Sequence, residues 1–154
     1  MYWTRYSSGS LHRAGMDGSN SRTLATGLVG PRGMTIDVTS ERFYGTERNS
    51  FTISSINLDG QGLRSLVQLP TGSNPYGMAV YGDRIYWGKA GDKKLQSSTK
   101  DGKDVQTLYT DAQDIHHLVI VPSVEQPANR VNHCVGRNCS KLCVLTPTSY
   151  RCLA

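Results

Sequence analysis

Apolar residues in this chain gather in short runs that are separated by polar, glycine-containing turns. Apolar and polar residues alternate at 53–58, and a short apolar run follows at 65–67. Further along, the apolar run 77–81 is followed by the aromatic run 85–87. Alternation and short runs are typical of β-strands, whereas an amphipathic helix would show a period of about 3.6 residues. The pattern therefore predicts an all-β protein with four strands in each unit.

The same unit recurs along the chain with a period of 42 residues. An aromatic motif, an Asp-Gly pair and a leucine all keep this spacing. The motifs are Tyr2-Trp3-Thr4, Tyr44-Gly45-Thr46 and Tyr86-Trp87-Gly88; the pairs are Asp17-Gly18, Asp59-Gly60 and Asp101-Gly102; the leucines are Leu24, Leu66 and Leu108. Because Asp-Gly favours the positive φ angles of a tight hairpin, each unit is expected to reverse direction at a fixed place. Four-stranded repeats of this length are typical of propeller blades.

These motifs, together with the cysteine-rich end of the chain, resemble a YWTD β-propeller followed by an EGF-like module, as in the low-density lipoprotein receptor family. The resemblance implies a propeller of six blades, of which this chain holds three. The expected divisions are propeller repeats at 1–42, 43–84 and 85–122, a linker at 123–131 and a truncated EGF-like module at 132–154. The fourth motif residue is Arg5, Glu47 or Lys89 where the family has Asp, so hydrogen bonding between blades through that Asp cannot be carried over.

All four cysteines lie in the last part of the chain, between Cys134 and Cys152. A segment this short cannot bury a hydrophobic core of its own, and such small units are usually stabilised by disulfides instead. A zinc site, with His133 as a further ligand, is the competing interpretation, but the C-x2-C pairs of structural zinc sites are missing. We therefore expect two disulfides and an extracellular, secreted protein. The resemblance implies that Cys134 pairs with Cys143 and Cys139 with Cys152.

An open arc of three blades would leave sheet faces and strand edges bare, which soluble β proteins avoid. The first repeat begins directly at its motif strand, whereas 118–121 has the pattern of an innermost strand with no blade after it. We therefore expect a homodimer in which each chain donates this strand to its partner and closes one six-bladed propeller. The alternative is that the chain is a piece of a longer receptor that folds together with other segments.

Composition and charge narrow the possible partners. The chain has 154 residues, of which 37% are hydrophobic, and no apolar run approaches the roughly 20 residues that a membrane-spanning helix needs. Lysine and arginine exceed the acidic residues by 17 to 12, for a net charge of +5, but the basic residues are scattered. This charge favours an acidic partner such as a sulfated glycan. We expect neither nucleic acid nor membrane insertion.

The sequence offers little catalytic chemistry. It contains no nucleophile elbow, no phosphate-binding glycine loop and no metal-ligand spacing of histidines and carboxylates. Asp114, His116 and His117 come nearest, but such a histidine pair beside a strand is more typical of a surface rim than of an acid–base pair. We therefore expect no enzyme, no cofactor and no metal.

The resemblance implies that partners dock at the centre of one propeller face. Two sets of residues would line it: those between Pro and Gly in the Pro-x-Gly turns, and those just after the aromatic motif. The first set is Arg32, Tyr76 and, in a degenerate third copy, His116; the second is Tyr6, Arg48 and Ala90. Arginine offers forked donors to carboxylate or sulfate, and Tyr or His offers a face to a sugar ring. The alternative is that the tyrosines pack between loops and the arginines are merely exposed.

The function expected from these features is that of a lectin, an extracellular carbohydrate-binding protein without enzymatic activity. Galactose-type, sulfated or acidic glycans would be its ligands, and the homodimer its active form. Two alternatives stay open: a receptor-like propeller that binds proteins or peptides, and a component of the extracellular matrix or of cell adhesion.

Overall fold

The computed structural model describes residues 1–91, 93–110, 115–120, 142–145 and 150–153, the last two ranges by their backbone. In these ranges every regular element is a β-strand, and every strand pair is antiparallel. No helix that could span a membrane occurs among the described residues. The prediction of an all-β fold is confirmed.

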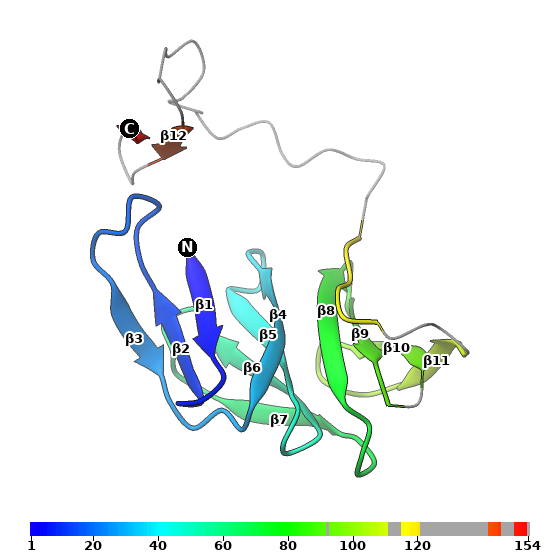
Figure 1. Ribbon diagram of the computed structural model, residues 1–154. Coiled ribbons are helices and arrows are strands. Elements are labelled where there is room, and N and C mark those ends of the chain that lie inside the picture. Colours follow the sequence, from blue (N-terminus) through cyan, green and yellow to red (C-terminus); the bar gives the residue numbers. More distant parts are fainter. Residues whose placement is uncertain (92, 111–114, 121–141, 146–149, 154) are drawn as a thin grey trace.

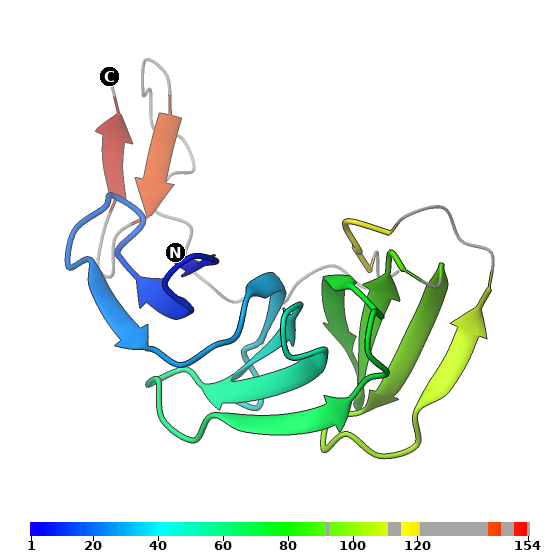
Figure 2. The same ribbon diagram turned by 60° about the horizontal axis from the view of Figure 1, so that its bottom comes forward.

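Three sheets follow one another along the chain and stand side by side in an arc (Figures 1 and 2). The first sheet contains β1 (Tyr2–Arg5), β2 (Ser10–Arg13) and β3 (Arg22–Ala25). The second contains β4 (Pro31–Asp37), β5 (Arg42–Glu47), β6 (Thr52–Asn57) and β7 (Arg64–Gln68). The third contains β8 (Pro75–Tyr81), β9 (Arg84–Lys89), β10 (Lys94–Thr99) and β11 (Gln106–Tyr109).

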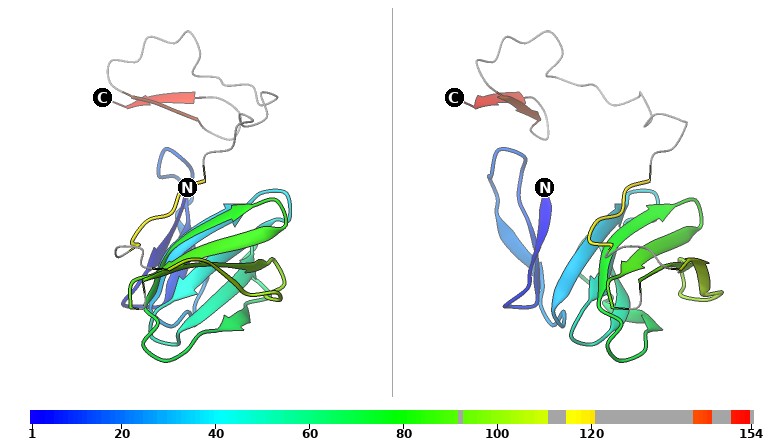
Figure 3. Two further views of the ribbon diagram at one scale, coloured as in Figure 1. Left: turned by 90° about the vertical axis from the view of Figure 1, so that its right-hand side faces the viewer. Right: turned by 45° about the vertical axis from the view of Figure 1, so that its right-hand side comes forward.

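In each sheet the strands pair in sequence order, so each blade is a simple meander. β4 and β8 lie on the inner side of the arc, and β3, β7 and β11 lie on the outer side (Figure 2). The turned views in Figure 3 show the same succession of sheets by colour, from blue through cyan to green. The second and third sheets thus each have the expected four strands, and the first sheet has three.

The core consists of clusters of buried side chains between neighbouring sheets, and one strand can contribute side chains to two of these clusters. Successive residues of a strand point to opposite faces, so in β5 Phe43 joins the cluster of Leu11 and Ile56 between the first and second sheets. Tyr44, the next residue, joins Ile53 and other residues in the cluster between the second and third sheets. The aromatic motif is therefore buried on both faces, unlike a strand of a half-solvated sheet.

The conserved spacing of Asp-Gly and Leu has a packing reason. Gly60 and Gly102 take positive φ angles of 91° and 83° in the hairpin turns that follow β6 and β10. A Cβ atom on Gly60 would lie 2.3 Å from the carbonyl oxygen of Leu24, and one on Gly102 would lie 2.3 Å from that of Leu66. Each turn therefore sits directly against the outer strand of the preceding blade, and only glycine fits there.

Side-chain bonds also join the blades. Thr46 accepts a hydrogen bond from the Gly33 amide at 2.8 Å and donates one to the Tyr76 carbonyl at 2.8 Å, which connects β5 to β8. Glu47 is 6% exposed, and its carboxylate accepts a hydrogen bond of 2.7 Å from the amide of Val29 in the connection before β4. The fourth motif position thus keeps a buried hydrogen bond in the second repeat, although Asp is replaced by Glu.

The strand predicted at 118–121 is wrong for the residues that the structure describes there, since 115–120 form no strand. This segment nevertheless lies close to β8: a Cβ atom on Gly77 would lie 2.8 Å from backbone atoms of His117 and Leu118. Strand geometry requires a hydrogen-bonded neighbour, and none is described for this segment. It therefore lies beside β8 as irregular backbone.

The two remaining strands, β12 (Leu142–Leu145) and β13 (Tyr150–Leu153), form a separate hairpin. Their register places Cys143 opposite Cys152 in the backbone pairing. Cys134 and Cys139, the linker 123–131 and most of the expected EGF-like module lie outside the described residues. The disulfide pairing and the module therefore stay predictions.

Candidate functional site

The predicted site residues lie at one end of the three sheets. Arg32 and Tyr76 are the second residues of β4 and β8, while Tyr6, Arg48 and Ala90 directly follow β1, β5 and β9. Because β4 is antiparallel to β5, and β8 to β9, the start of each inner strand meets the end of its neighbour. All five positions therefore come to the same edge of the arc.

The Pro-x-Gly turn creates this edge through a bulge and a close approach. The register shifts between Pro31 and Met34 and again between Pro75 and Met78, and such irregularities re-aim side chains at strand ends. A Cβ atom on Gly33 would lie 1.8 Å from the Tyr76 carbonyl oxygen. The glycine thus lets the inner strand of the third blade approach that of the second.

Four of the predicted residues form one continuous row of rings and charge. The guanidinium of Arg32 lies between two rings, 4.6 Å from the centre of Tyr6 and 4.8 Å from that of Tyr76. The ring of Tyr76 meets the ring of His116 edge to face, with centres 4.7 Å apart. We call these four residues the Arg32 row. It runs from the first blade across the second and third to the segment 115–120.

Two asparagines support the row, and sequence reasoning missed both of them. The Tyr6 hydroxyl donates a hydrogen bond of 3.1 Å to the side-chain oxygen of Asn49. Arg48 Nε donates a hydrogen bond of 3.2 Å to the side-chain oxygen of Asn74. The main-chain carbonyl of Asn74 accepts a hydrogen bond of 3.1 Å from the main-chain amide of Ala90. Ala90 therefore joins the site through its backbone.

A sequence signal for Asn74 does exist. It directly precedes a Pro-x-Gly turn, as Gly30 does one repeat earlier, and both residues have positive φ angles, 43° and 67°. Glycine and asparagine are the residues that most readily adopt this conformation. The repeat thus requires a left-handed residue before the turn, and Asn74 meets the requirement with a side chain that also accepts a hydrogen bond.

The Arg32 row borders an open hollow of about 530 Å³. Its lining consists of Arg32, Gly33, Met34, Tyr76, Gly77, Met78, His116, His117 and Leu118. The Nε atom of Arg32 is buried and has no hydrogen-bond partner among the described residues. Two flanking rings hold the guanidinium, at about 0.5–1 kcal/mol for each cation–π contact. A ligand would therefore meet an arginine that is already positioned.

The electrostatic character of this edge is positive. The pKa of the Tyr6 hydroxyl is lowered, first by its hydrogen bond with Asn49 and then by the guanidinium groups of Arg48 and Arg32. The carboxylate of Glu47, at the end of β5, accepts its hydrogen bond from the Val29 amide. Forked donors beside aromatic faces suit recognition of carboxylate or amide groups. In the described part of the chain, no group of His, Cys, Asp or Glu could hold a metal ion.

Comparison with known proteins places this geometry in context. No protein-family model matches the chain. The vitellogenin receptor Yl of Drosophila melanogaster is 30% identical over 94% of the chain, which spans 7% of that protein. The vitellogenin receptor of Solenopsis invicta is 31% identical over 99% of the chain, spanning 9% of that protein. The low-density lipoprotein receptor-related protein 5 of mouse is 30% identical over 91%, again spanning 9%.

A solved structure is similar in fold and in sequence. In a crystal structure of a nidogen/laminin complex, one chain matches with a TM-score of 0.65 and 28% identity, over 71% of this chain and 43% of that one. The fold and the site edge define a β-propeller module built of YWTD-type repeats. The chain carries the YWTD propeller repeats of the low-density lipoprotein receptor family, so the resemblance is confirmed.

These comparisons overturn the main functional prediction. The lectin interpretation is wrong: the relatives are receptors, and the similar solved structure is a complex between proteins. The predicted glycan partner is wrong for the same reason. Its chemical basis was not specific, because arginine and tyrosine suit a protein surface as well as a sugar. The predicted homodimer is corrected as well, since in the relatives the matching segment lies within a single, much longer chain.

Proposed function

We propose that the chain is part of a receptor-like propeller outside the cell, and that it binds a protein partner at the edge carrying the Arg32 row. Binding rather than catalysis is supported by the chemistry of the row, which combines a guanidinium with aromatic rings. The C-terminal residues 132–154 would form a disulfide-bonded EGF-like module beside the repeats at 1–122. The receptor relatives support this assignment.

The observation that carries the proposal is the position of Arg32. Its side chain is clamped by two aromatic rings from different blades, and its Nε atom is buried without a partner among the described residues. An unpaired buried donor costs about 1–3 kcal/mol, which would be recovered if Nε donated a hydrogen bond to an acceptor of the ligand. Aromatic residues and arginine are also the side chains that most often dominate protein–protein binding.

The expected anchor of the partner is an acidic or amide side chain that accepts the guanidinium fork. Such a group would enter the hollow beside Arg32 and Tyr76, while neighbouring apolar residues of the partner would meet the partly buried Met34 in the lining. Because the row is held in place before binding, the partner would lose little binding energy to ordering of this edge.

The test uses random 12-residue peptides displayed on phage and selected on the 154-residue chain. We expect the selected peptides to share an Asp, Glu or Asn, and we expect Arg32→Ala to weaken their binding at least about tenfold, the effect of losing one charged hydrogen bond. Arg64→Ala on β7 removes an equal charge far from the row and is the matched control. Peptides that bind Arg32→Ala as tightly as the unchanged chain would contradict the proposal.

A further inference from the structure

The outer hairpin of each repeat contains one cross-strand pair that differs between the three copies. The pairs are Arg13 opposite Arg22 in β2 and β3, Ser55 opposite Arg64 in β6 and β7, and Ser97 opposite Gln106 in β10 and β11. Each pair lies 42 residues from the next along the chain, so the three are equivalent positions of one repeat. Only the first copy places two cations opposite each other.

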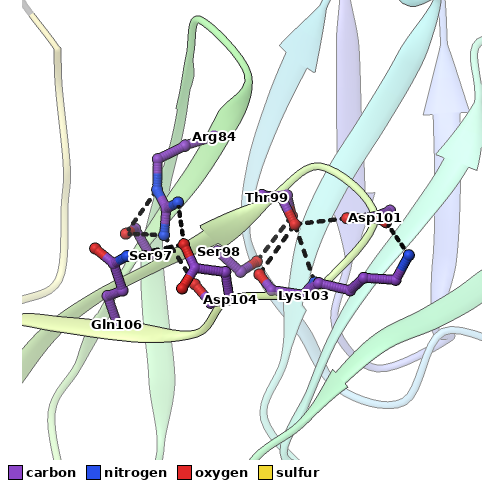
Figure 4. A network of polar contacts seen from close by, with 8 residues as sticks. All are labelled: Arg84, Ser97, Ser98, Thr99, Asp101, Lys103, Asp104 and Gln106. Carbon is purple, nitrogen blue, oxygen red and sulfur yellow. Dashed lines mark hydrogen bonds and ion pairs between the residues drawn. The ribbon is translucent and has the colours of Figure 1, made fainter.

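In the second and third copies, side chains of the pair make hydrogen bonds to other groups of the protein. Ser55 Oγ accepts hydrogen bonds from Arg64 Nε at 3.3 Å and from Arg42 at 2.9 Å. Ser97 Oγ accepts two from Arg84, at 3.2 and 3.1 Å. Figure 4 shows the third network, in which Arg84 and Gln106 also bond to Asp104, each at 2.8 Å. In these hairpins the cross-strand pair is therefore part of a network of internal hydrogen bonds.

The first copy lacks such a network. Arg13 and Arg22 face each other, and like charges at directly opposite positions destabilise a strand pair. Among the described residues, no ion pair involves either arginine. The Arg13 guanidinium instead lies over the ring of Tyr2, 5.6 Å from its centre. Two exposed arginines thus occupy directly opposite positions of the strand pair, and neither has an ion pair within the described part of the chain.

A hollow of about 470 Å³ lies beside this pair. It is lined by Arg13, Ala14, Gly15, Ser19, Asn20, Ser21 and Arg22, a set that contains two arginines and two serines but no acidic residue. The nearest acidic side chain in the hairpin, Asp17, accepts hydrogen bonds from the Ser19 amide at 3.1 Å and hydroxyl at 2.6 Å. That carboxylate is therefore engaged in the turn.

This hollow is separate from the Arg32 row. Tyr2 pairs with Arg13 at the start of β1, and the chain then runs along β1 to Tyr6 beyond the opposite end. The two places thus lie at opposite ends of the first sheet, and a ligand at one leaves the other accessible.

We propose that the hollow between Arg13 and Arg22 binds a phosphate group, of the kind carried by a phosphate monoester. One guanidinium fork satisfies one carboxylate, so two forks and a serine hydroxyl call for a group with more acceptors. A phosphate monoester offers three terminal oxygens and a charge of about −1.5 to −2 at pH 7. It therefore balances both arginines at once and relieves their repulsion across the strand pair.

The experiment titrates the ¹⁵N-labelled 154-residue chain with inorganic phosphate and with O-phosphoserine at physiological salt. We expect saturable amide shifts confined to residues 13–22, and a rise in Tm on adding phosphate. Arg13→Ser recreates the Ser–Arg pair of the second copy, and the double variant Arg13→Ser/Arg22→Gln recreates the Ser–Gln pair of the third, so both keep a pair that the fold accepts; Arg22→Gln alone removes the second charge. Each single variant should weaken phosphate binding at least about tenfold, the loss of one charge-assisted contact, and the double variant should show no saturable shifts.

Arg64→Gln is the matched control, since it removes the same charge at the same strand position of the second repeat and should leave phosphate binding unchanged. Equal phosphate binding by the double variant would overturn the proposal, as would shifts spread evenly over the basic surface. Two further arms test the ligand class. Sulfate or a glutamate dipeptide that binds as tightly as phosphate would show that the hollow takes any anion and would refute the phosphate assignment.

Discussion

Leu66 and Leu108 hold the same place in successive blades, yet their surroundings differ. The Gly102 turn of the third blade lies against Leu66, whereas Leu108 on β11 is 47% exposed. The same contrast extends to whole strands: β6 of the second blade is buried along almost its full length, whereas most of β10, its equivalent in the third blade, is only partly buried. Burial in this arc therefore depends on which neighbour a blade has, and equivalent sequences need not be equally buried.

The largest expected effect comes from the layer between the second and third sheets. Ile53 in β6 is fully buried, while Leu95, its equivalent in β10, is only partly buried. Ile53→Ala should lower the free energy of unfolding by about 3–4 kcal/mol, because it removes packed methyl groups and leaves a cavity. Leu95→Ala should lower it by about 1 kcal/mol. Urea denaturation followed by tryptophan fluorescence measures both, and equal losses would refute the comparison.

The hairpin turns allow a sharper test of contact between blades. Gly18 and Gly102 both have a φ angle of 83°, but a Cβ atom on Gly18 would meet nothing within 4 Å, whereas one on Gly102 would meet the Leu66 carbonyl. Gly18→Ala should cost about 1–2 kcal/mol for the left-handed conformation alone. Gly102→Ala should cost a further 1–3 kcal/mol for the clash. The difference between the two variants in thermal or urea unfolding isolates the contact, and a difference near zero would contradict it.

A smaller effect is expected from the ion pair between Asp37 of the second blade and Lys100 of the third. Burial raises the pKa of Asp37, but hydrogen bonds from Lys100 and Ser40 outweigh it, so this pKa lies below its ordinary value of 3.8. The resulting stabilisation is complete above the pKa of the unfolded state and is lost as the pH falls through the lower folded value. Asp37→Asn should therefore cost about 1–2 kcal/mol at pH 7 and progressively less below pH 4.

The exposed pair Asp101–Lys103 is the control for this measurement. Its groups are 52% and 81% exposed, although Lys103 lowers the pKa of Asp101 to about 2. Solvent screens such pairs strongly, so Lys103→Ala should leave the urea midpoint at pH 7 unchanged. A midpoint shift as large as that of Asp37→Asn would show that burial between blades is not the reason why the Asp37–Lys100 pair stabilises the fold.

Much of the candidate site was accessible from the repeat pattern together with the family resemblance. The six predicted positions all lie at one end of the sheets or beside it, because strand direction alternates within each meander. What the pattern could not supply was contact between repeats. Arg32 touches Tyr6 and Tyr76, which are 26 and 44 residues away in sequence. The supporting roles of Asn49 and Asn74 also depend on loops from different repeats.

The wrong predictions have physical causes of the same kind. The choice of a glycan as ligand in the lectin interpretation rested on net charge and aromatic residues, and these properties do not distinguish a sugar from a protein surface. The strand at 118–121 was inferred from an apolar run, but a strand also needs a partner edge, and 115–120 has none among the described residues.

Order and pairing of the strands within each blade follow from the sequence, because hairpins join residues that are close along the chain and the Asp-Gly turns set where each one reverses. The tertiary structure decided three other features. It determined how far each sheet is buried by its neighbours, placed Arg32 between two aromatic rings, and set Arg13 opposite Arg22 beside a hollow. Burial and charge balance are properties of neighbours in space, and a repeat that looks the same in sequence acquires a different environment at each place in the arc.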